Sequence, residues 1–167
     1  TINNLGSVCN KPSLSITINP IYINNSNNAT ITFTSNKDTN NFTSTDISVT
    51  SGSISNFTAT SSKVYTVNYT PPLNSTGTVT FSVADNAFTD SSGSGNISST
   101  LSISFDTISP TLSLFTNDHD DLIVRDADTV EITATFSEAM SSSPVISITG
   151  VVTNVAMTAS TTSSSRT

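Results

Sequence analysis

The chain has 167 residues and a formal net charge of −7, and its five lysines and arginines are spread along the sequence. Because no basic stripe forms, the composition disfavours binding to nucleic acid or to anionic lipid. Only 10% of the residues are charged, whereas 62 are serine or threonine, so a disordered tail held open by charge repulsion is also disfavoured. No apolar run approaches the ~20 residues of a membrane-spanning helix.

Residues 1–11 show no sustained period and are predicted to be a lead-in linker. From Pro12 onward, apolar residues alternate with serine and threonine, which is the pattern of a half-buried strand. The alternating segments are Leu14–Ile18, Ala29–Phe33, Ile47–Val49, Ile54–Phe57, Tyr65–Tyr69, Val79–Val83 and Leu101–Phe105. Pro20 is expected to end or kink the first strand, and Gly52 to break the third. The odd spacing of Ile54 and Phe57 predicts a bulge.

Seven short strands without any helical period predict an all-β fold, an antiparallel sandwich of immunoglobulin type. The cysteine–tryptophan–cysteine signature of antibody domains is absent, since the chain has no tryptophan and a single cysteine, Cys9. The predicted core consists of Leu14, Ile16, Ile31, Phe33, Ile47, Val49, Phe57, Tyr65, Val67, Val79, Phe81, Val83, Leu101 and Ile103.

The sequence from Pro110 onward resembles the first hundred residues. Matching pairs are Pro12–Ile16 with Pro110–Leu114 and Gly52–Thr58 with Gly150–Ala156, each 98 residues apart, and Thr30–Thr34 with Thr133–Ser137, 103 residues apart. A self-match at a fixed period predicts tandem, Ig-like β-sandwiches. We therefore expect one complete repeat at 12–108 and the start of a second, incomplete repeat at 109–167.

The second repeat has predicted strands near 112–115, 130–136, 145–148 and 151–157, but no counterparts of the strands at Tyr65, Val79 and Leu101. Half a sandwich leaves a sheet face and open edges uncovered. We expect residues 110–167 not to be a stable domain alone, and either the chain to continue past Thr167 or another segment to cover this sheet.

Acidic residues cluster shortly after the junction between the repeats. Asp118, Asp120, Asp121, Asp126 and Asp128 lie within eleven residues, and Asp106 precedes them. Carboxylate and carbonyl oxygens are the ligands that Ca²⁺ takes. The cluster and Asp106, with the loop that carries Asp85 and Asp90, are therefore a candidate calcium site that ties the repeats together. The alternative is a solvated acidic turn.

Nothing in the sequence indicates catalysis, and we expect no enzyme activity. His119 is the only histidine and lies among aspartates on a polar loop. Asp85 and Asp90 could form the carboxylate pair of a glycosidase, but no groove-lining tryptophan accompanies them, and a turn is the favoured interpretation.

Several motifs point to a known family. Phe136–Met140, Pro144–Gly150, the junction Phe105–Pro110 and the loop Ala84–Asp90 resemble recurrent motifs of bacterial Ig-like repeats in giant surface adhesins. The second repeat in particular resembles repeats of SprB-type gliding-motility adhesins of Bacteroidetes. This resemblance implies a long secreted filament on the cell surface, exported by type IX secretion, in which this chain is a structural segment serving adhesion and gliding motility.

The resemblance also implies partners and modifications. Its partners would be neighbouring Ig-like repeats, surface glycans or substratum reached through regions outside this segment, and the secretion or gliding machinery. The composition and the lack of a long apolar run, independently, predict no nucleic-acid partner and no membrane insertion. Asp106–Ile108 and Asp128–Val130 resemble the O-glycosylation motif of Bacteroidetes, which makes Thr107 and Thr129 candidate acceptors. The alternative function is a carbohydrate-binding or accessory module of a secreted enzyme. Such modules expose aromatic side chains, whereas the tyrosines here are expected to face the core.

Overall fold

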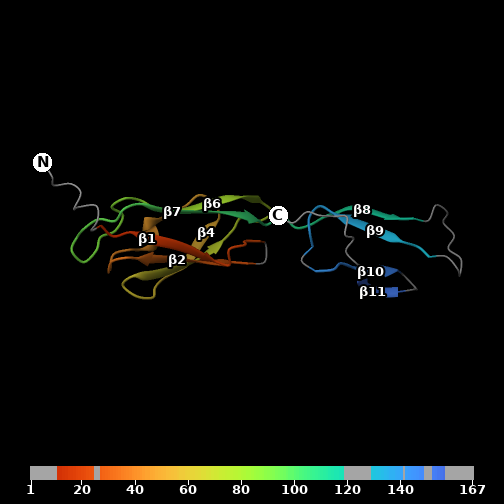
Figure 1. The fold of residues 1–167 in the computed structure, drawn as a ribbon, viewed down its shortest axis with the longest axis horizontal. Helices are drawn as coiled ribbons and strands as arrows, with labels where there is room; N and C mark the ends of the chain where they lie inside the picture. The colour runs from red at the N-terminus through yellow and green to blue at the C-terminus, as the bar shows by residue number, and fades with distance from the viewer. Residues whose placement is uncertain (1–10, 25–26, 119–128, 141, 149–151, 157–167) are drawn as a thin grey trace. The chain divides into compact units, whose positions relative to one another are not determined.

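A computed structural model describes residues 11–24, 27–118, 129–140, 142–148 and 152–156. The chain divides into two compact units, Thr1–Ile108 and Ser109–Thr167 (Figure 1). Every strand described pairs antiparallel with its sheet neighbours. Within the described residues, no helix has the length and apolar character needed to span a bilayer.

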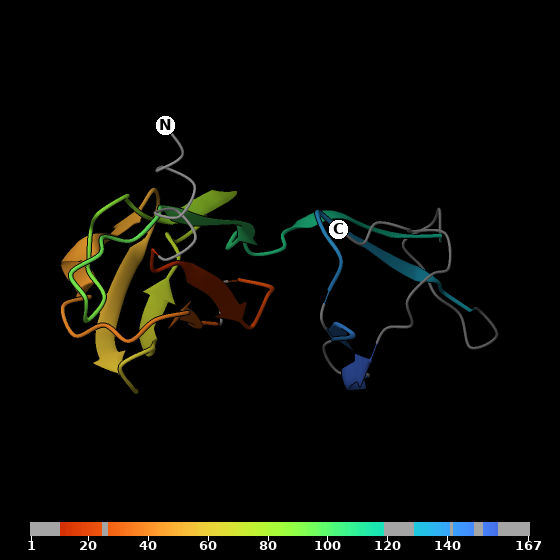
Figure 2. The ribbon, with the colours of Figure 1, turned by 60° about the vertical axis from the view of Figure 1, so that its left-hand side comes forward.

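The first unit is a two-layer β-sandwich (Figures 1 and 2). One sheet has the order β1 (Leu14–Asn19), β2 (Ala29–Ser35), β5 (Val64–Thr70), β4 (Ser53–Ala59), and the other β3 (Ile47–Val49), β6 (Thr76–Val83), β7 (Ser99–Asp106). Seven strands split four and three in this order are the arrangement of constant-type immunoglobulin domains. The predicted all-β, Ig-like sandwich is therefore confirmed.

Local irregularities fall where the sequence predicts them. The strand β1 ends at Asn19, directly before Pro20. Gly52 has φ of +75°, a conformation that glycine adopts without steric cost, and it separates β3 from β4. The pairing of β4 with β5 shifts register between Ser55 and Thr58, and Asn56 within the shift has φ of 52°. This bulge lies in an edge strand, where it hinders pairing with another chain.

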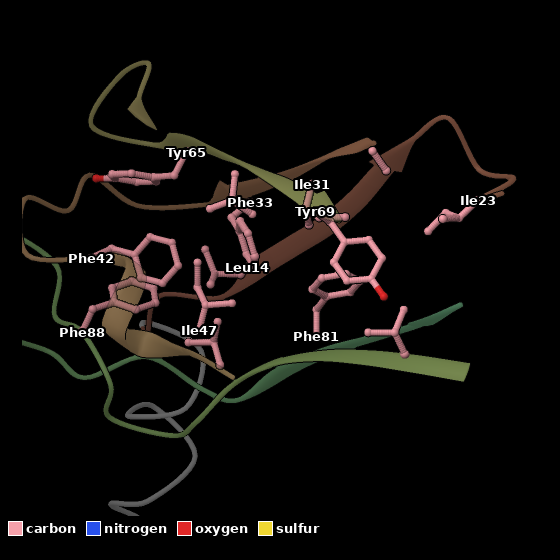
Figure 3. Packing of buried hydrophobic residues seen from close by; sticks show 14 of the residues in the cluster. Leu14, Ile23, Ile31, Phe33, Phe42, Ile47, Tyr65, Tyr69, Phe81 and Phe88 are labelled. Carbon is pink, nitrogen blue, oxygen red and sulfur yellow. The ribbon is translucent and has the colours of Figure 1, made fainter. Parts of the chain in front are cut away.

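Every residue of the predicted core is either buried or packed against the buried cluster. The cluster also contains six residues outside the predicted core list. Ala29, Tyr69 and Phe105 belong to predicted strands, whereas Ile23, Phe42 and Phe88 lie outside them. Phe42 and Phe88 come from loops, and their ring centroids lie 5.1 Å apart. Figure 3 shows the Phe42 ring between those of Tyr65 and Phe88, at one end of the core.

The outward faces explain the abundance of hydroxyl groups. Thr17 of β1 stands opposite Thr32 of β2, which stands opposite Thr66 of β5, and Thr66 is paired with Thr58 of β4. One row of threonines thus crosses the whole sheet on the face away from the core. Threonine suits a pleated, half-buried surface, so this face is polar without carrying charge.

The second unit consists of two separate hairpins. One pairs β8 (Leu112–Asn117) with β9 (Ile132–Phe136), and the other pairs β10 (Val145–Ile148) with β11 (Val152–Ala156). Each residue of β8 is exposed to solvent. No described residue of this unit belongs to the buried hydrophobic cluster.

Candidate functional site

The loop between β6 and β7 is closed by the carboxylate of Asp90. One of its oxygens, Oδ1, accepts hydrogen bonds from the backbone N–H groups of Ser92 and Ser94, both at 2.9 Å, and from the Ser92 hydroxyl at 2.6 Å. The bond from the Ser92 side chain, followed by that from the Ser94 N–H, holds the pKa of Asp90 below its usual value. The carboxylate therefore stabilises its own turn, which is the structural role that the sequence favoured over glycoside cleavage.

Asn96 fastens the same loop to the core. Its buried amide accepts a hydrogen bond from the Phe88 N–H at 2.9 Å and donates to the carbonyl oxygens of Ala84 and Ile97 at 2.8 and 2.9 Å. Because Asn96 holds the backbone at Phe88, the Phe88 ring is directed into the core. The polar side chains at this end of the sandwich thus position an aromatic ring.

Thr107 fastens a loop by buried hydrogen bonds at the opposite end of the sandwich, directly after β7. Its fully buried hydroxyl accepts from the Ser75 N–H at 3.0 Å and lies 2.7 and 2.9 Å from the carbonyl oxygens of Pro72 and Ser75, to which it can donate its proton. Thr107 therefore binds the loop between β5 and β6 to the end of β7. In the folded unit its hydroxyl is inaccessible to a glycosyltransferase, so the structure does not support Thr107 as an acceptor. Thr129 is exposed.

The predicted calcium ligands are only partly described. The Asp106 carboxylate accepts from the Ile108 N–H at 3.0 Å, and that of Asp118 accepts from the Glu131 N–H at 2.7 Å. Asp120, Asp121, Asp126 and Asp128 lie outside the described residues, as does His119. In the part of the chain that the structure describes, no three histidine, cysteine, aspartate or glutamate side chains gather as a metal site. The calcium site stays a prediction.

One part of that prediction is wrong. The sequence grouped Asp106 with the loop that carries Asp85 and Asp90. In the antiparallel pairing of β6 with β7, Val83 faces Ser99 and Thr76 faces Asp106. Asp85 and Asp90 follow Val83, so they lie at the far end of β7 from Asp106, about 23 Å away at ~3.3 Å per residue. A single cation cannot contact both.

Exposed apolar side chains gather on the loops at the Thr107 end of the first unit. Ile21 is 66% exposed and Tyr22 83% exposed in the loop after β1, and Leu73 is 75% exposed in the loop after β5. Tyr22 corrects the expectation that the tyrosines face the core, because only Tyr65 and Tyr69 do so. After Pro20, three consecutive large apolar side chains, Ile21, Tyr22 and Ile23, interrupt the strand alternation. This break in the pattern is the sequence signal for an exposed apolar loop.

Residues 9–107 match the family model of a bacterial Ig-like domain. The chain belongs to the bacterial Ig-like domain family. A search of curated proteins finds no match. The matched range of this bacterial Ig-like domain includes all seven strands of the sandwich and ends at Thr107, the residue that fixes the last strand to the neighbouring loop.

Proposed function

We propose that this bacterial Ig-like chain is a structural segment of a secreted cell-surface adhesin filament. The supporting observation is that the chain enters the sandwich at one end and leaves it at the other. Pro12, before β1, accepts a hydrogen bond from Ile97 near the start of β7, whereas Ile108 follows the end of β7. The two chain ends therefore leave from opposite ends of the unit, the geometry that repeats need in order to stack head to tail.

The first and last strands of the unit are also tied side by side. The carbonyl oxygens of Pro12 and Ile23 accept from the N–H groups of Ile97 and Asp106 at 2.9 and 3.0 Å, and Leu14 accepts from the Ser99 hydroxyl at 3.0 Å. Residues 12–23 thus run parallel to 97–106. A pull applied to the two chain ends would load these bonds together, in shear, which suits a segment of a filament under tension.

Three parts of this proposal rest on the resemblance of the sequence to adhesin repeats: export by type IX secretion, gliding motility of the SprB type, and neighbouring Ig-like repeats as partners. Calcium at the acidic cluster is proposed from the spacing of its aspartates, and the lack of enzyme activity is proposed because the sequence offers no catalytic constellation. The uncharged hydroxyl face of the first sheet is compatible with an extracellular location, since it hydrates the surface without attracting ionic partners.

Cell-surface localisation tests the proposal. Antibodies raised against the folded first unit should label intact cells of the source bacterium, and external protease should remove the label. A matched cytoplasmic protein should survive the same protease treatment. Labelling only after the cells are lysed would contradict the proposal.

Carbohydrate binding is the second candidate, and the exposed Tyr22 favours it. An aromatic ring that is 83% exposed can stack on a sugar ring, and Leu73 extends the apolar surface at the same end of the unit. If the chain binds on a glycan array and the Tyr22→Ser variant does not, carbohydrate binding is favoured. Absence of binding, or equal binding by Tyr22→Ser, would favour the structural role.

A further inference from the structure

The chain enters and leaves the first unit through two fully buried residues. Pro12 precedes β1 and Thr107 follows β7, and both side chains are fully buried. Immediately outside them, Lys11 is half-buried and Ile108 is 47% exposed. The end residues of a domain are poorly ordered unless something ties them down. The burial of Thr107 therefore needs a physical cause at the point where the chain leaves the unit.

That cause is a set of hydrogen bonds to a single loop. The Thr107 N–H donates to the Ser75 carbonyl at 2.8 Å, and the Thr107 hydroxyl accepts from the Ser75 N–H at 3.0 Å. The same hydroxyl lies 2.7 Å from the carbonyl oxygen of Pro72 and 2.9 Å from that of Ser75. Breaking such bonds leaves buried donors and acceptors without partners, which is costly in free energy.

The loop that supplies these partners is stiff. Pro71 and Pro72 fix two successive φ angles. Asn74 has φ of 49°, a left-handed conformation that asparagine tolerates in tight turns. Thr76, the first residue of β6, adds a hydrogen bond from its hydroxyl to the Phe105 carbonyl at 3.3 Å. Thr107 is thus fastened to a stiff turn that leads directly into the strand beside β7.

The position of β7 makes this attachment important under tension. β7 lies at an edge of its sheet and pairs with β6 from Asp106 opposite Thr76 to Ser99 opposite Val83. A sideways pull on Asp106 would break the bonds of this ladder one after another, each carrying the whole force. A pull along the strand loads all of the bonds at once, so each carries only a share. The direction in which force reaches β7 therefore decides how much tension the unit withstands.

We propose that Thr107 is a force-bearing latch at the exit of the first unit. This inference rests on the proposed role of the chain as a filament segment under tension. Force that arrives through Ile108 meets the buried bonds of Thr107 before it reaches β7. The end of β7 therefore stays beside the turn at 72–75, and the tension is passed along the strand, where the bonds to β6 and to residues 12–23 share it.

Pulling single molecules of the full-length chain tests the latch. Handles at the two chain ends apply a constant force, and the unfolding rate of the first unit is measured. Thr107→Val keeps the size of the side chain but removes its hydroxyl, so its unfolding rate should rise about ten-fold because buried partners lose their bonds. Thr107→Ser keeps the hydroxyl and should stay within about three-fold of the wild type.

Tyr65→Phe is the matched control at the opposite end of the sandwich. It also removes a buried hydroxyl that donates to a backbone carbonyl, that of Thr39 at 2.7 Å. Urea denaturation should show similar losses of stability in Tyr65→Phe and Thr107→Val. Under force, Tyr65→Phe should unfold within about three-fold of the wild-type rate, because the lost bond does not bear the pull.

A second attachment point makes the test independent of any change at Thr107. In a chain with Cys9→Ser and Ser104→Cys, a handle on the exposed position 104 pulls on β7 before the latch and bypasses it. This chain should unfold about ten-fold faster than the Cys9→Ser chain pulled through its two ends at the same force. Adding Thr107→Val should change the rate from position 104 by less than about two-fold.

Three results would overturn the proposal: a wild-type unfolding rate in Thr107→Val under force, an equal acceleration in Tyr65→Phe, or equal rates from both attachment points in the chain that keeps Thr107. If Thr107→Val does not fold, the comparison of attachment points decides alone. None of these results bears on cell-surface labelling, so failure of the latch and failure of the proposed function are distinguishable.

Discussion

At the scale of single residues, the Tyr69 hydroxyl stands out as a destabilising feature. It is buried, and within the described structure it has no hydrogen-bond partner. Its ring packs edge-on against Phe81 with centroids 5.0 Å apart, and burial raises the pKa of the phenol, so it stays neutral. A buried polar group without a partner costs about 1–3 kcal/mol.

Tyr69→Phe should therefore stabilise the first unit by about 1 kcal/mol, because it removes the unpaired hydroxyl and keeps the ring. The matched control is Tyr65→Phe, since the Tyr65 hydroxyl donates to the Thr39 carbonyl at 2.7 Å. The free energy of unfolding of Tyr65→Phe should be lower than that of the wild type by about 1 kcal/mol. Urea denaturation measures both free energies of unfolding, and equal changes of the same sign would contradict the prediction.

Asp90 should make stability depend on pH in acid. Its folded-state pKa is below the ordinary value of 3.8, chiefly because the Ser92 side chain hydrogen-bonds to the charged form. The resulting stability is present above pH 3.8 and is lost as pH falls through the lowered pKa.

Asp90→Asn removes this titration. The difference in melting temperature between wild type and Asp90→Asn should be constant near neutral pH and shrink below about pH 4. A difference between wild type and Asp90→Asn that does not change with pH would show that the carboxylate bonds contribute nothing.

At the scale of elements, loops supply part of the core. The Phe42 ring lies 5.1 Å from those of Phe88 and Tyr65 and 5.6 and 5.8 Å from those of Phe33 and Phe57, measured between centroids. Strand periodicity does not detect Phe42 or Phe88, since each is an isolated aromatic in a polar loop. Asn96 holds the backbone at Phe88, and Asn41, next to Phe42, hydrogen-bonds to Thr89.

Phe42→Ala should destabilise the first unit by about 3–5 kcal/mol, the usual cost of removing a buried aromatic ring. Phe115→Ala, at an exposed position of β8, should change stability by no more than about 0.5 kcal/mol. Guanidinium denaturation followed by circular dichroism compares the two. Similar small effects would mean that the loop aromatics do not contribute to the core.

At the scale of the whole molecule, the two units differ in how much apolar surface they bury. The first unit has a continuous core of fifteen hydrophobic residues. In the second, Leu112, Leu114 and Phe115 are each more than half exposed. Cooperative unfolding requires a shared core, which the described residues provide only in the first unit.

Calorimetry of the 167-residue chain should therefore show one cooperative transition, from the first unit. If the acidic cluster binds calcium, millimolar Ca²⁺ should raise or add a transition, because a ligand that binds only the folded state stabilises it. Two cooperative transitions without calcium would contradict the expectation that residues 110–167 are not stable alone. No change with calcium would remove the predicted site.

The sequence by itself determined the strands and the fold class. Alternation of apolar residues with threonine and serine identified all seven strands, and the spacing of Ile54 and Phe57 located the bulge, because side-chain period and turn residues are local properties of the chain. These local signals also marked Pro20 as the end of β1. They were sufficient to predict an immunoglobulin-type sandwich.

Only the tertiary structure decided which groups meet. Burial of Thr107 and Phe42, the exposure of Tyr22, and the separation of Asp90 from Asp106 depend on how distant strands pair. Register between strands and the closure of loops over the core are set by contacts between separate segments of the chain, such as Ser75 with Thr107 and Asn41 with Thr89, and these contacts leave no period in the sequence.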